Sequence, residues 1–280
     1  MTDNPGQLKD KIAGLKKELR AVIVAHNYQR PEIQDIADFV GDSLELSRHC
    51  TEIDARTIVF GGVHFMAETA AILNPERTVL LSEDSAGCPL ADMITLDELR
   101  RWKQRYPRAA VVCYINSSAE IKAESDICCT SANGVKVVNS LASNDILFIP
   151  DHNLGHYVSR QTKKKVILFP GFCIVHNRLT AGEVEKAKEL HPEAQFLAHP
   201  ECRPEVIALA DAVLSTSGFC RYAGREEVKE MLVGTEIGII HRLRKENPEK
   251  RFIPVSEQAV CPNMKLITLD KILWSLEEME

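Results

Sequence analysis

Short apolar runs and amphipathic segments alternate along this chain. Apolar runs such as residues 21–25, 57–60 and 109–113 predict buried strands of a parallel sheet. Amphipathic segments such as residues 8–19, 64–73 and 96–106 predict helices between the strands. Alternation of strands and helices is typical of α/β folds, in which helices cover both faces of a parallel sheet.

This order of elements occurs three times, in repeats of roughly 85 residues. The expected strands lie at 21–25, 39–40, 57–60 and 78–81, then at 109–113, 127–129, 146–149 and 166–169, then at 195–198, 212–214, 231–233 and 252–255. Short motifs repeat in the same register, because Asp38 matches Asp126 and Asp211. A fixed period indicates one structural unit used repeatedly.

We therefore predict three homologous three-layer αβα domains with parallel four-stranded sheets, arranged with pseudo-threefold symmetry around a central site. The expected domains are residues 1–90 together with a C-terminal helix at 266–280, residues 91–176, and residues 177–265. The last helix is expected to fold back against the first domain.

Polar residues occupy matching positions where the first strand of each repeat ends. These residues are His26, Tyr114 and His199, followed two positions later by Tyr28, Asn116 and Glu201. Ligands of parallel sheets bind beyond the carboxyl ends of the strands. Histidine, glutamate and tyrosine are residue types that move protons in catalysis. We expect these six side chains to face one pocket.

Hydroxyl residues follow the second strand of each repeat. Ser43, Ser131 and Thr216 are predicted to cap the helices that begin there. Free backbone N–H groups at a helix N-terminus also attract carboxylates and phosphates. Both interpretations are compatible, and together they indicate a substrate with several negative charges.

A cysteine follows the fourth strand of each repeat, and a threonine that opens a helix follows each cysteine. The cysteines are Cys88, Cys173 and Cys261, and the threonines are Thr95, Thr180 and Thr268. Three thiolates that meet at one point bind a metal ion or an iron–sulfur cluster. A [4Fe–4S] cluster held by three cysteines leaves one iron free to act as a Lewis acid. Zinc is the alternative, although zinc sites usually contain a local C-x-x-C pair and this chain has none.

The other cysteines are predicted to be structural. The chain has nine cysteines, and an odd count in a reducing setting argues against a disulfide framework. Cys113, Cys128 and Cys129 lie in apolar runs, where a free cysteine behaves as a small hydrophobic residue.

Composition and motif searches exclude several classes of function. A net charge of −6 argues against a nucleic-acid partner, although it leaves room for a local anion site. The sequence contains no signal-like segment and no apolar run of membrane length, so we expect a cytoplasmic protein without a membrane partner. The glycine-rich fingerprints of dinucleotide-binding proteins and NTPases are also missing from the sequence.

A set of motifs in this order resembles the quinolinate synthase A family, iron–sulfur enzymes of de novo NAD biosynthesis. The motifs are Ala25–Tyr28, Gly41–Ser43, Val63–Glu68, Cys129–Asn133, Pro170–Cys173, Ala198–Cys202, Ser215–Gly218, Val233–Glu236 and Cys261–Met264. The resemblance spans nearly the whole chain and implies three αβα domains around a cluster held by three cysteines. Some members carry a C-terminal C-x-x-C-x-x-C motif. Here no cysteine follows Cys261, so thiol–disulfide control is not expected at that end.

The resemblance implies a reaction and a role for each matched residue. Iminoaspartate condenses with dihydroxyacetone phosphate to quinolinate, with release of phosphate and two waters, and another enzyme supplies the iminoaspartate. Cys88, Cys173 and Cys261 would hold a [4Fe–4S] cluster whose open iron assists the dehydration. Tyr28, His199 and Glu201 would move protons. Substrate would be held by His26, Ser43, Tyr114, Asn116, Ser131, His176, Ser215 and Thr216.

Two rival functions are consistent with the three cysteines. A non-catalytic iron–sulfur redox or iron sensor would change its spectrum reversibly with oxidant and form no product. A zinc hydrolase would contain zinc in place of iron and sulfide. Neither rival explains the polar residues at the other strand ends.

Overall fold

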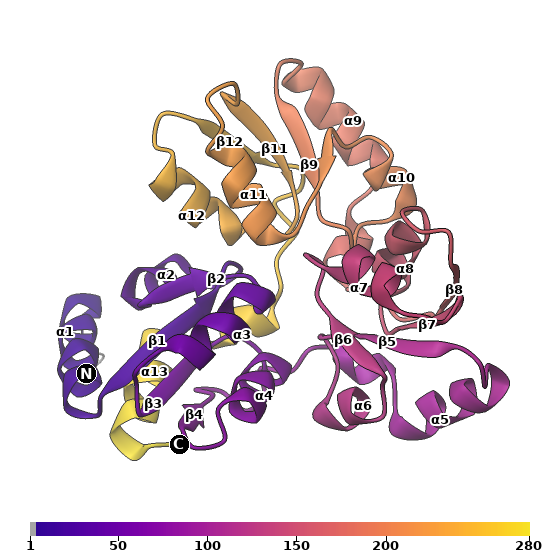
Figure 1. Cartoon of the computed structure of the whole chain (residues 1–280). Coiled ribbons are helices and arrows are strands. Elements are labelled where there is room, and N and C mark those ends of the chain that lie inside the picture. The colour runs from indigo at the N-terminus through magenta and orange to yellow at the C-terminus, as the bar shows by residue number, and fades with distance from the viewer. Residues whose placement is uncertain (1–3) are drawn as a thin grey trace. The chain divides into compact units, whose positions relative to one another are not determined.

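The computed structural model describes residues 4–280 and divides into two compact units (Figure 1). The first unit comprises the chain up to Cys88 together with Cys261–Glu280, and the second comprises Pro89–Val260. Residues 1–3 of the predicted first domain lie outside the described residues. The division into three domains and their pseudo-threefold arrangement stay predictions.

The first unit contains one parallel sheet with the strand order β2-β1-β3-β4. Its strands are β1 (Ala21–His26), β2 (Phe39–Gly41), β3 (Thr57–Gly61) and β4 (Thr78–Leu80). Its helices are α1 (Pro5–Glu18), α2 (Pro31–Ile36), α3 (Ser43–Glu52), α4 (His64–Leu73) and α13 (Leu269–Glu278).

Helices from the two ends of the chain cover one face of this sheet. Ile12 of α1 and Ile272 of α13 share a buried cluster with Ile23 of β1. Val24, the neighbour of Ile23, is also fully buried, so the other face of the sheet is covered too. Full burial of a side chain such as Ile272 stabilises the fold by about 1.5–3 kcal/mol. The C-terminal helix α13 therefore packs together with α1 on the sheet of the first unit.

The second unit contains two further parallel sheets, with the orders β6-β5-β7-β8 and β10-β9-β11-β12. Their strands are β5 (Ala110–Tyr114), β6 (Ile127–Cys129), β7 (Asp145–Ile149), β8 (Lys165–Leu168), β9 (Gln195–Ala198), β10 (Ala212–Val213), β11 (Glu230–Gly234) and β12 (Arg251–Pro254). Their helices are α5 (Leu96–Arg105), α6 (Ala119–Ala123), α7 (Gly134–Ser140), α8 (His152–Ser159), α9 (Ala181–Leu190), α10 (Pro204–Ile207), α11 (Thr216–Ala223) and α12 (Ile239–Glu246).

The three sheets share one strand order, which confirms the predicted α/β class with repeated four-stranded sheets. The aspartates matched in the sequence make the same contact in each repeat, because a carboxylate oxygen accepts from a strand N–H. Asp38 accepts from Ile23 at 2.8 Å, Asp126 from Val111 at 2.7 Å, and Asp211 from Phe196 at 2.7 Å. The aspartate thus fixes the start of the second strand against the first.

Helix starts show where the sequence prediction is right and where it is wrong. Thr95, Thr180 and Thr268 are N-caps as predicted, and each accepts a bond from a backbone N–H three residues on. The predicted caps Ser43, Ser131 and Thr216 are not caps. Asp42 caps α3 and Ser215 caps α11, so Ser43 and Thr216 are the first helical residues.

The turn before α7 has a different construction. Asn133 stands at the N-cap position of α7 without a side-chain cap, and its Oδ1 instead accepts from the N–H of Thr130 at 2.7 Å. Ser131 therefore lies inside a turn closed by Thr130 and Asn133.

Two further features complete the fold. A short 3-10 helix follows each of the three cysteines at Ala91–Met93, His176–Arg178 and Asn263–Leu266. Among the helices of residues 4–280, none is long and apolar enough to cross a membrane.

Candidate functional site

In each repeat, a polar residue lies where the first strand ends, at the carboxyl edge of that repeat's sheet. His26 and Tyr114 are the last residues of β1 and β5, and His199 directly follows β9. The strands are parallel throughout, so the loops after β4, β8 and β12 leave from the same edges. Those loops carry Cys88, Cys173 and Cys261.

The loop that carries Cys173 is held closely against the end of β7. A Cβ on Gly171 would lie 2.5 Å from the carbonyl oxygen of Pro150, so no larger residue fits there. Gly171 accepts from the N–H of His152 at 2.7 Å. Asp151 Oδ2 accepts from the N–H of Cys173 at 3.1 Å. These contacts fix the backbone on which the Cys173 thiol is presented.

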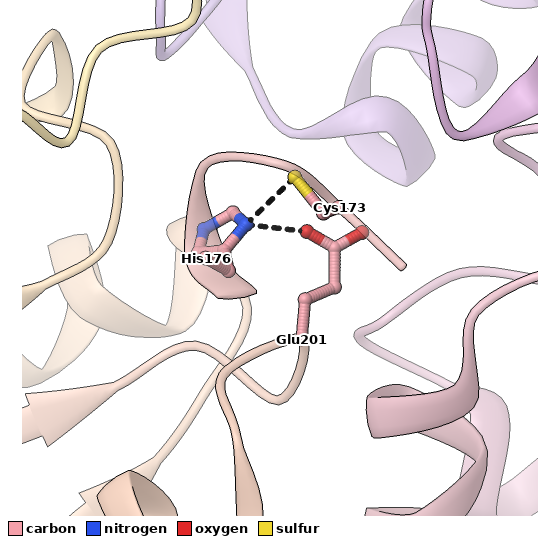
Figure 2. Close-up of side chains that lie close together, drawn as sticks. All are labelled: Cys173, His176 and Glu201. Carbon is pink, nitrogen blue, oxygen red and sulfur yellow. Dashed lines mark hydrogen bonds and ion pairs between the residues drawn. The ribbon is translucent and has the colours of Figure 1, made fainter. Parts of the chain in front are cut away.

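Cys173, His176 and Glu201 form a compact cluster, shown in Figure 2. His176 Nδ1 lies 3.2 Å from Cys173 Sγ and 2.7 Å from Glu201 Oε2. His176 and Glu201 are almost fully buried, whereas Cys173 is partly exposed. A partly accessible thiol therefore stands against a buried histidine–carboxylate pair.

Two further side chains fix the orientation of the His176 ring. Thr235, which is fully buried directly after β11, places its Oγ1 2.8 Å from His176 Nε2. The ring of His199 stacks on that of His176 with centroids 4.5 Å apart. His199 Nδ1 lies 3.4 Å from Glu201 Oε2. Both nitrogens of His176 are thus engaged, and Glu201 faces two imidazoles.

Glu201 is the electrostatic centre of this cluster, which we name the Glu201 cluster (Cys173, His176, His199, Glu201 and Thr235). Burial would raise the pKa of Glu201, but the charges of His176 and His199 and their hydrogen bonds outweigh it. The pKa of Glu201 is therefore held well below its ordinary value, and the group is a carboxylate. Its Oε1 is buried and has no hydrogen-bond partner. A buried anionic oxygen without a partner is poised to accept a proton or to bind a cation.

A second buried carboxyl group lies nearby. Asp151 is fully buried, and its Oδ1 accepts from the N–H of Leu154 at 2.6 Å. Burial and the negative charge of Glu201 raise the pKa of Asp151, against the hydrogen bonds from the backbone of Leu154 and Cys173. Asn153 links the same region, because its Nδ2 donates to the carbonyl oxygen of Glu201 at 3.1 Å.

This part of the structure contains donors suited to a metal. One ligand atom each from Cys173, His176 and Glu201 lie within 4.8 Å of one another. Cys88 and Cys261, which belong to the first unit, are partly exposed like Cys173 and form no disulfide, whereas five of the other cysteines are buried. Partly exposed cysteine thiols are the ligand type that iron–sulfur clusters and zinc ions take in proteins.

The first unit groups a second set of predicted residues. His26 Nδ1 accepts from the N–H of Tyr28 at 3.2 Å, and the two rings meet edge to face at 4.6 Å. His199 Nδ1 accepts from the N–H of Glu201 in the same way at 3.4 Å, so the repeats share this turn. Lys265 Nζ donates to the carbonyl oxygen of Tyr28. Ser43 begins α3 in the same unit.

The remaining predicted residues lie at strand ends of the second unit. Tyr114 is buried, and its carbonyl oxygen accepts from Ser117 Oγ at 3.0 Å. Asn116 carries a buried Oδ1 without a hydrogen-bond partner. Ser215 and Thr216 are buried at the start of α11. Among the predicted site residues, direct contacts join Cys173, His176, His199 and Glu201 in this unit, and His26 with Tyr28 in the first.

Sequence reasoning missed Asp151, Asn153 and Thr235 as site residues. All three follow the third strand of a repeat, whereas the prediction used only the ends of the first, second and fourth strands. The available signal was the polar pairs Asp151-His152 and Thr235-Glu236 directly after apolar runs. The same strand-end rule, applied to every strand, identifies them.

Comparisons with known proteins agree with these observations. A sequence model of the family described as quinolinate synthetase A protein matches residues 10–280. A quinolinate synthase from Dehalococcoides mccartyi is 62% identical over 273 residues, which cover 98% of this chain and 90% of that protein. Quinolinate synthase 2 from Methanosarcina acetivorans is 55% identical, with 98% and 88% covered. A quinolinate synthase from Thermodesulfovibrio yellowstonii is 53% identical over 270 residues, with 96% and 89% covered.

Proposed function

The chain belongs to the quinolinate synthetase A protein family, and on this premise we propose that it is a quinolinate synthase. It condenses iminoaspartate with dihydroxyacetone phosphate and releases phosphate and two waters, as a step of NAD biosynthesis. The observation that carries the proposal is the match to the family over residues 10–280. The buried Glu201 cluster supports it, because proton transfers accompany both the condensation and the loss of water.

The proposed cofactor is a [4Fe–4S] cluster held by Cys88, Cys173 and Cys261. None of the three forms a disulfide and each is partly accessible, and the unpartnered Oε1 of Glu201 lies in the Glu201 cluster, which contains Cys173. Such a donor set fits an iron–sulfur group. When bound, the group supplies an open iron that acts as a Lewis acid on substrate oxygen atoms.

Glu201 is the proposed proton acceptor. The depressed pKa keeps it ionised, and its free Oε1 offers a lone pair to a substrate C–H or O–H. His199 shares Oε2 of the same carboxylate and passes protons to and from it. Tyr28, fixed against His26 in the first unit, is the third proposed proton carrier.

The other predicted residues hold the charged substrates. Ser43 and Thr216 begin α3 and α11, where backbone N–H groups and the helix dipole favour carboxylate or phosphate. His26, Tyr114, Asn116, Ser131 and Ser215 are the other proposed substrate contacts. Both ring nitrogens of His176 are engaged, so we assign His176 the task of positioning Glu201 and Cys173.

Two further proposals concern the cellular setting. Iminoaspartate hydrolyses readily because it is an imine, so a second enzyme that produces it must supply it close by. None of the nine cysteines, all of which the structure describes, forms a disulfide, and we propose that the protein works in the reducing cytoplasm.

The experiment is an anaerobic assay for quinolinate with purified protein, iminoaspartate and dihydroxyacetone phosphate. The wild type is expected to form quinolinate. Glu201→Gln is expected to retain iron and to lose turnover by about 10²–10⁴-fold, the usual contribution of a general base. Glu205→Gln, a half-exposed glutamate of α10 four residues on, is the matched control and should retain both.

Two results would contradict these assignments. Near-normal turnover in Glu201→Gln would exclude Glu201 as a proton carrier. Iron-loaded wild-type protein that forms no quinolinate but changes its absorbance reversibly with oxidant would indicate the iron–sulfur sensor instead.

A further inference from the structure

Two cysteines face each other across neighbouring strands in the second unit. Cys113 of β5 and Cys128 of β6 are direct register partners in a parallel pair. Side chains of such partners point to the same face of the sheet, and neighbouring strands lie about 4.8 Å apart. A disulfide needs Cα atoms roughly 4.4–6.8 Å apart, so the backbone brings the two residues within bonding range.

The two thiols differ sharply in their surroundings. Cys113 is fully buried in a hydrophobic cluster with Val111 and Ile121. Cys128 lies on β6, the edge strand of the sheet, and is exposed. The sequence-based prediction that Cys128 is a structural hydrophobic residue is therefore wrong, because an edge strand leaves one side of it open to solvent.

The neighbouring Cys113 makes Cys128 the more acidic and more nucleophilic of the two thiols. The Cys113 thiol lowers the pKa of Cys128 to about 7, partial burial opposes this, and the positive charge of Lys122 adds to it. The same interaction with Cys128, together with burial, raises the pKa of Cys113 well above its ordinary value. Cys113 therefore keeps its proton, while a pKa of about 7 leaves Cys128 as thiolate in roughly half of the molecules at neutral pH.

No other cysteine of the chain has this combination. Cys128 is the single exposed thiol among the nine cysteines, all of which the structure describes. Cys129, the next residue, is buried, and burial raises its pKa. An accessible thiolate beside a second thiol is the arrangement typical of redox-sensitive cysteines.

We propose that Cys128 is a site of reversible thiol modification and that Cys113 is its resolving partner. The oxidant is a low-molecular-weight disulfide such as glutathione disulfide. The Cys128 thiolate attacks one sulfur of the oxidant, a Cys128–glutathione bond forms, and one glutathione thiolate leaves. Cys113 then attacks Cys128 Sγ, the Cys113–Cys128 bond forms, and the second glutathione leaves with the Cys113 proton. The cysteines lose two electrons, and glutathione disulfide gains them.

The cross-link forms beside proposed substrate-binding residues. Cys113 directly precedes Tyr114, and its Sγ lies 3.3 Å from the Tyr114 carbonyl oxygen, a contact it must give up to form the bond. Cys128 lies three residues before Ser131. A disulfide that includes the exposed Cys128 would be easily reducible. Oxidation should therefore displace both strand ends and lower activity, and a thiol reductant should restore it.

The sequence permits a direct test by mass spectrometry. Anaerobically purified holoenzyme is treated with glutathione disulfide while absorbance near ~400 nm reports that the cluster is intact. Trypsin separates Cys113, on peptide 109–122, from Cys128 and Cys129, on peptide 123–136. The expected result is a disulfide-linked pair of these peptides that disappears with dithiothreitol. Activity should fall in proportion to the linked fraction and return on reduction.

Three variants identify which cysteine reacts with glutathione disulfide and which one completes the link. Cys113→Ser should trap glutathione on peptide 123–136, because no resolving thiol is present. Cys128→Ser should yield neither the mixed disulfide nor the link. Cys129→Ser, the control on the same strand, should still form the link, since Cys128 and Cys113 are intact.

Two results would overturn the proposal. In the first, glutathione remains on wild-type Cys128 without a link. In the second, Cys128→Ser still links the two peptides, which would make Cys129 the partner. A link that leaves turnover unchanged would refute the regulatory consequence. That consequence rests on the proposed quinolinate synthase activity, whereas the linked peptides are measured without any activity, so the two failures are distinguishable.

Discussion

Replacing Thr235 by valine removes one hydroxyl from the Glu201 cluster and leaves the shape of the side chain nearly unchanged. The Oγ1 of Thr235 lies 2.8 Å from Nε2 of His176, whose ring is 1% exposed. Valine offers no partner to that nitrogen, and water has little access to it. Leaving a buried polar group without its hydrogen bond costs about 1–3 kcal/mol.

This loss of a hydrogen bond is expected to lower both the stability of the fold and the turnover of the enzyme. If it falls on the orientation of His176 that supports Glu201, 1–3 kcal/mol corresponds to about 5–150-fold lower turnover. Thr235→Ser is the matched control, because serine keeps the hydroxyl and loses one methyl group, worth about 0.8 kcal/mol. Valine should therefore be the more damaging change, although it is the larger and more hydrophobic side chain.

The assay measures kcat for quinolinate formation and the midpoint of urea unfolding, followed by tryptophan fluorescence, for the three proteins. Nitrogen NMR of ¹⁵N-labelled histidine adds a readout of the His176 tautomer, which a purely structural role of Thr235 would leave unchanged. Equal kcat values and equal His176 spectra in the valine and serine variants would refute the reasoning, because the hydroxyl would then have no role.

Three other changes give contrasting expectations. Gly171→Ala forces a Cβ to within 2.5 Å of the Pro150 carbonyl oxygen and should lower thermal stability and metal content. Gly182→Ala is the control, because the space around Gly182 is open, and it should raise stability by about 0.4–1 kcal/mol. Equal melting temperatures of the two variants would contradict this expectation. Asp126→Ala removes the acceptor for the Val111 N–H and should cost about 1.5–3 kcal/mol in denaturant unfolding, and Asp126→Asn clearly less. The rate at which iodoacetamide alkylates Cys128 should rise with pH and reach half its maximum at about pH 7, because the thiolate forms above the pKa of Cys128. Cys113→Ala should move this midpoint to higher pH. An unchanged midpoint would exclude Cys113 as the cause of the lowered pKa.

The central strands were the most predictable from sequence because they are buried on both faces. The run 146–149 contains only apolar, fully buried side chains, so its apolar character and its length together specify a strand of a parallel sheet. The repeated Asp38 was also informative, since its contact with the first strand recurs in every repeat.

Helix caps were less predictable, because neighbouring polar residues compete for one position. Asp42 and Ser43 both suit an N-cap, and Asp42 takes it because Glu45 completes a capping box three residues on. In the third repeat, Ser215 and Thr216 compete in the same way. The preference for Ser43 overlooked this spacing, which was present in the sequence.

Long-range contacts could not be predicted from any local pattern. Thr235 meets His176, a residue 59 positions away in the chain, and only the packed unit shows that both ring nitrogens are engaged. The exposure of Cys128 likewise depends on the strand order, which places β6 at the edge of its sheet. The sequence shows which residues have side chains able to bind metals or transfer protons, and the fold determines which of them come into contact.

The central claim is that this chain is an iron–sulfur quinolinate synthase whose cluster is held by Cys88, Cys173 and Cys261. The most direct measurement is iron, acid-labile sulfide and quinolinate formation on anaerobically purified wild type and on the three single cysteine-to-alanine variants. The account predicts about four irons per chain and product in the wild type, and neither in any variant. Zinc in place of iron, or a Cys173→Ala variant that keeps both cluster and turnover, would contradict it.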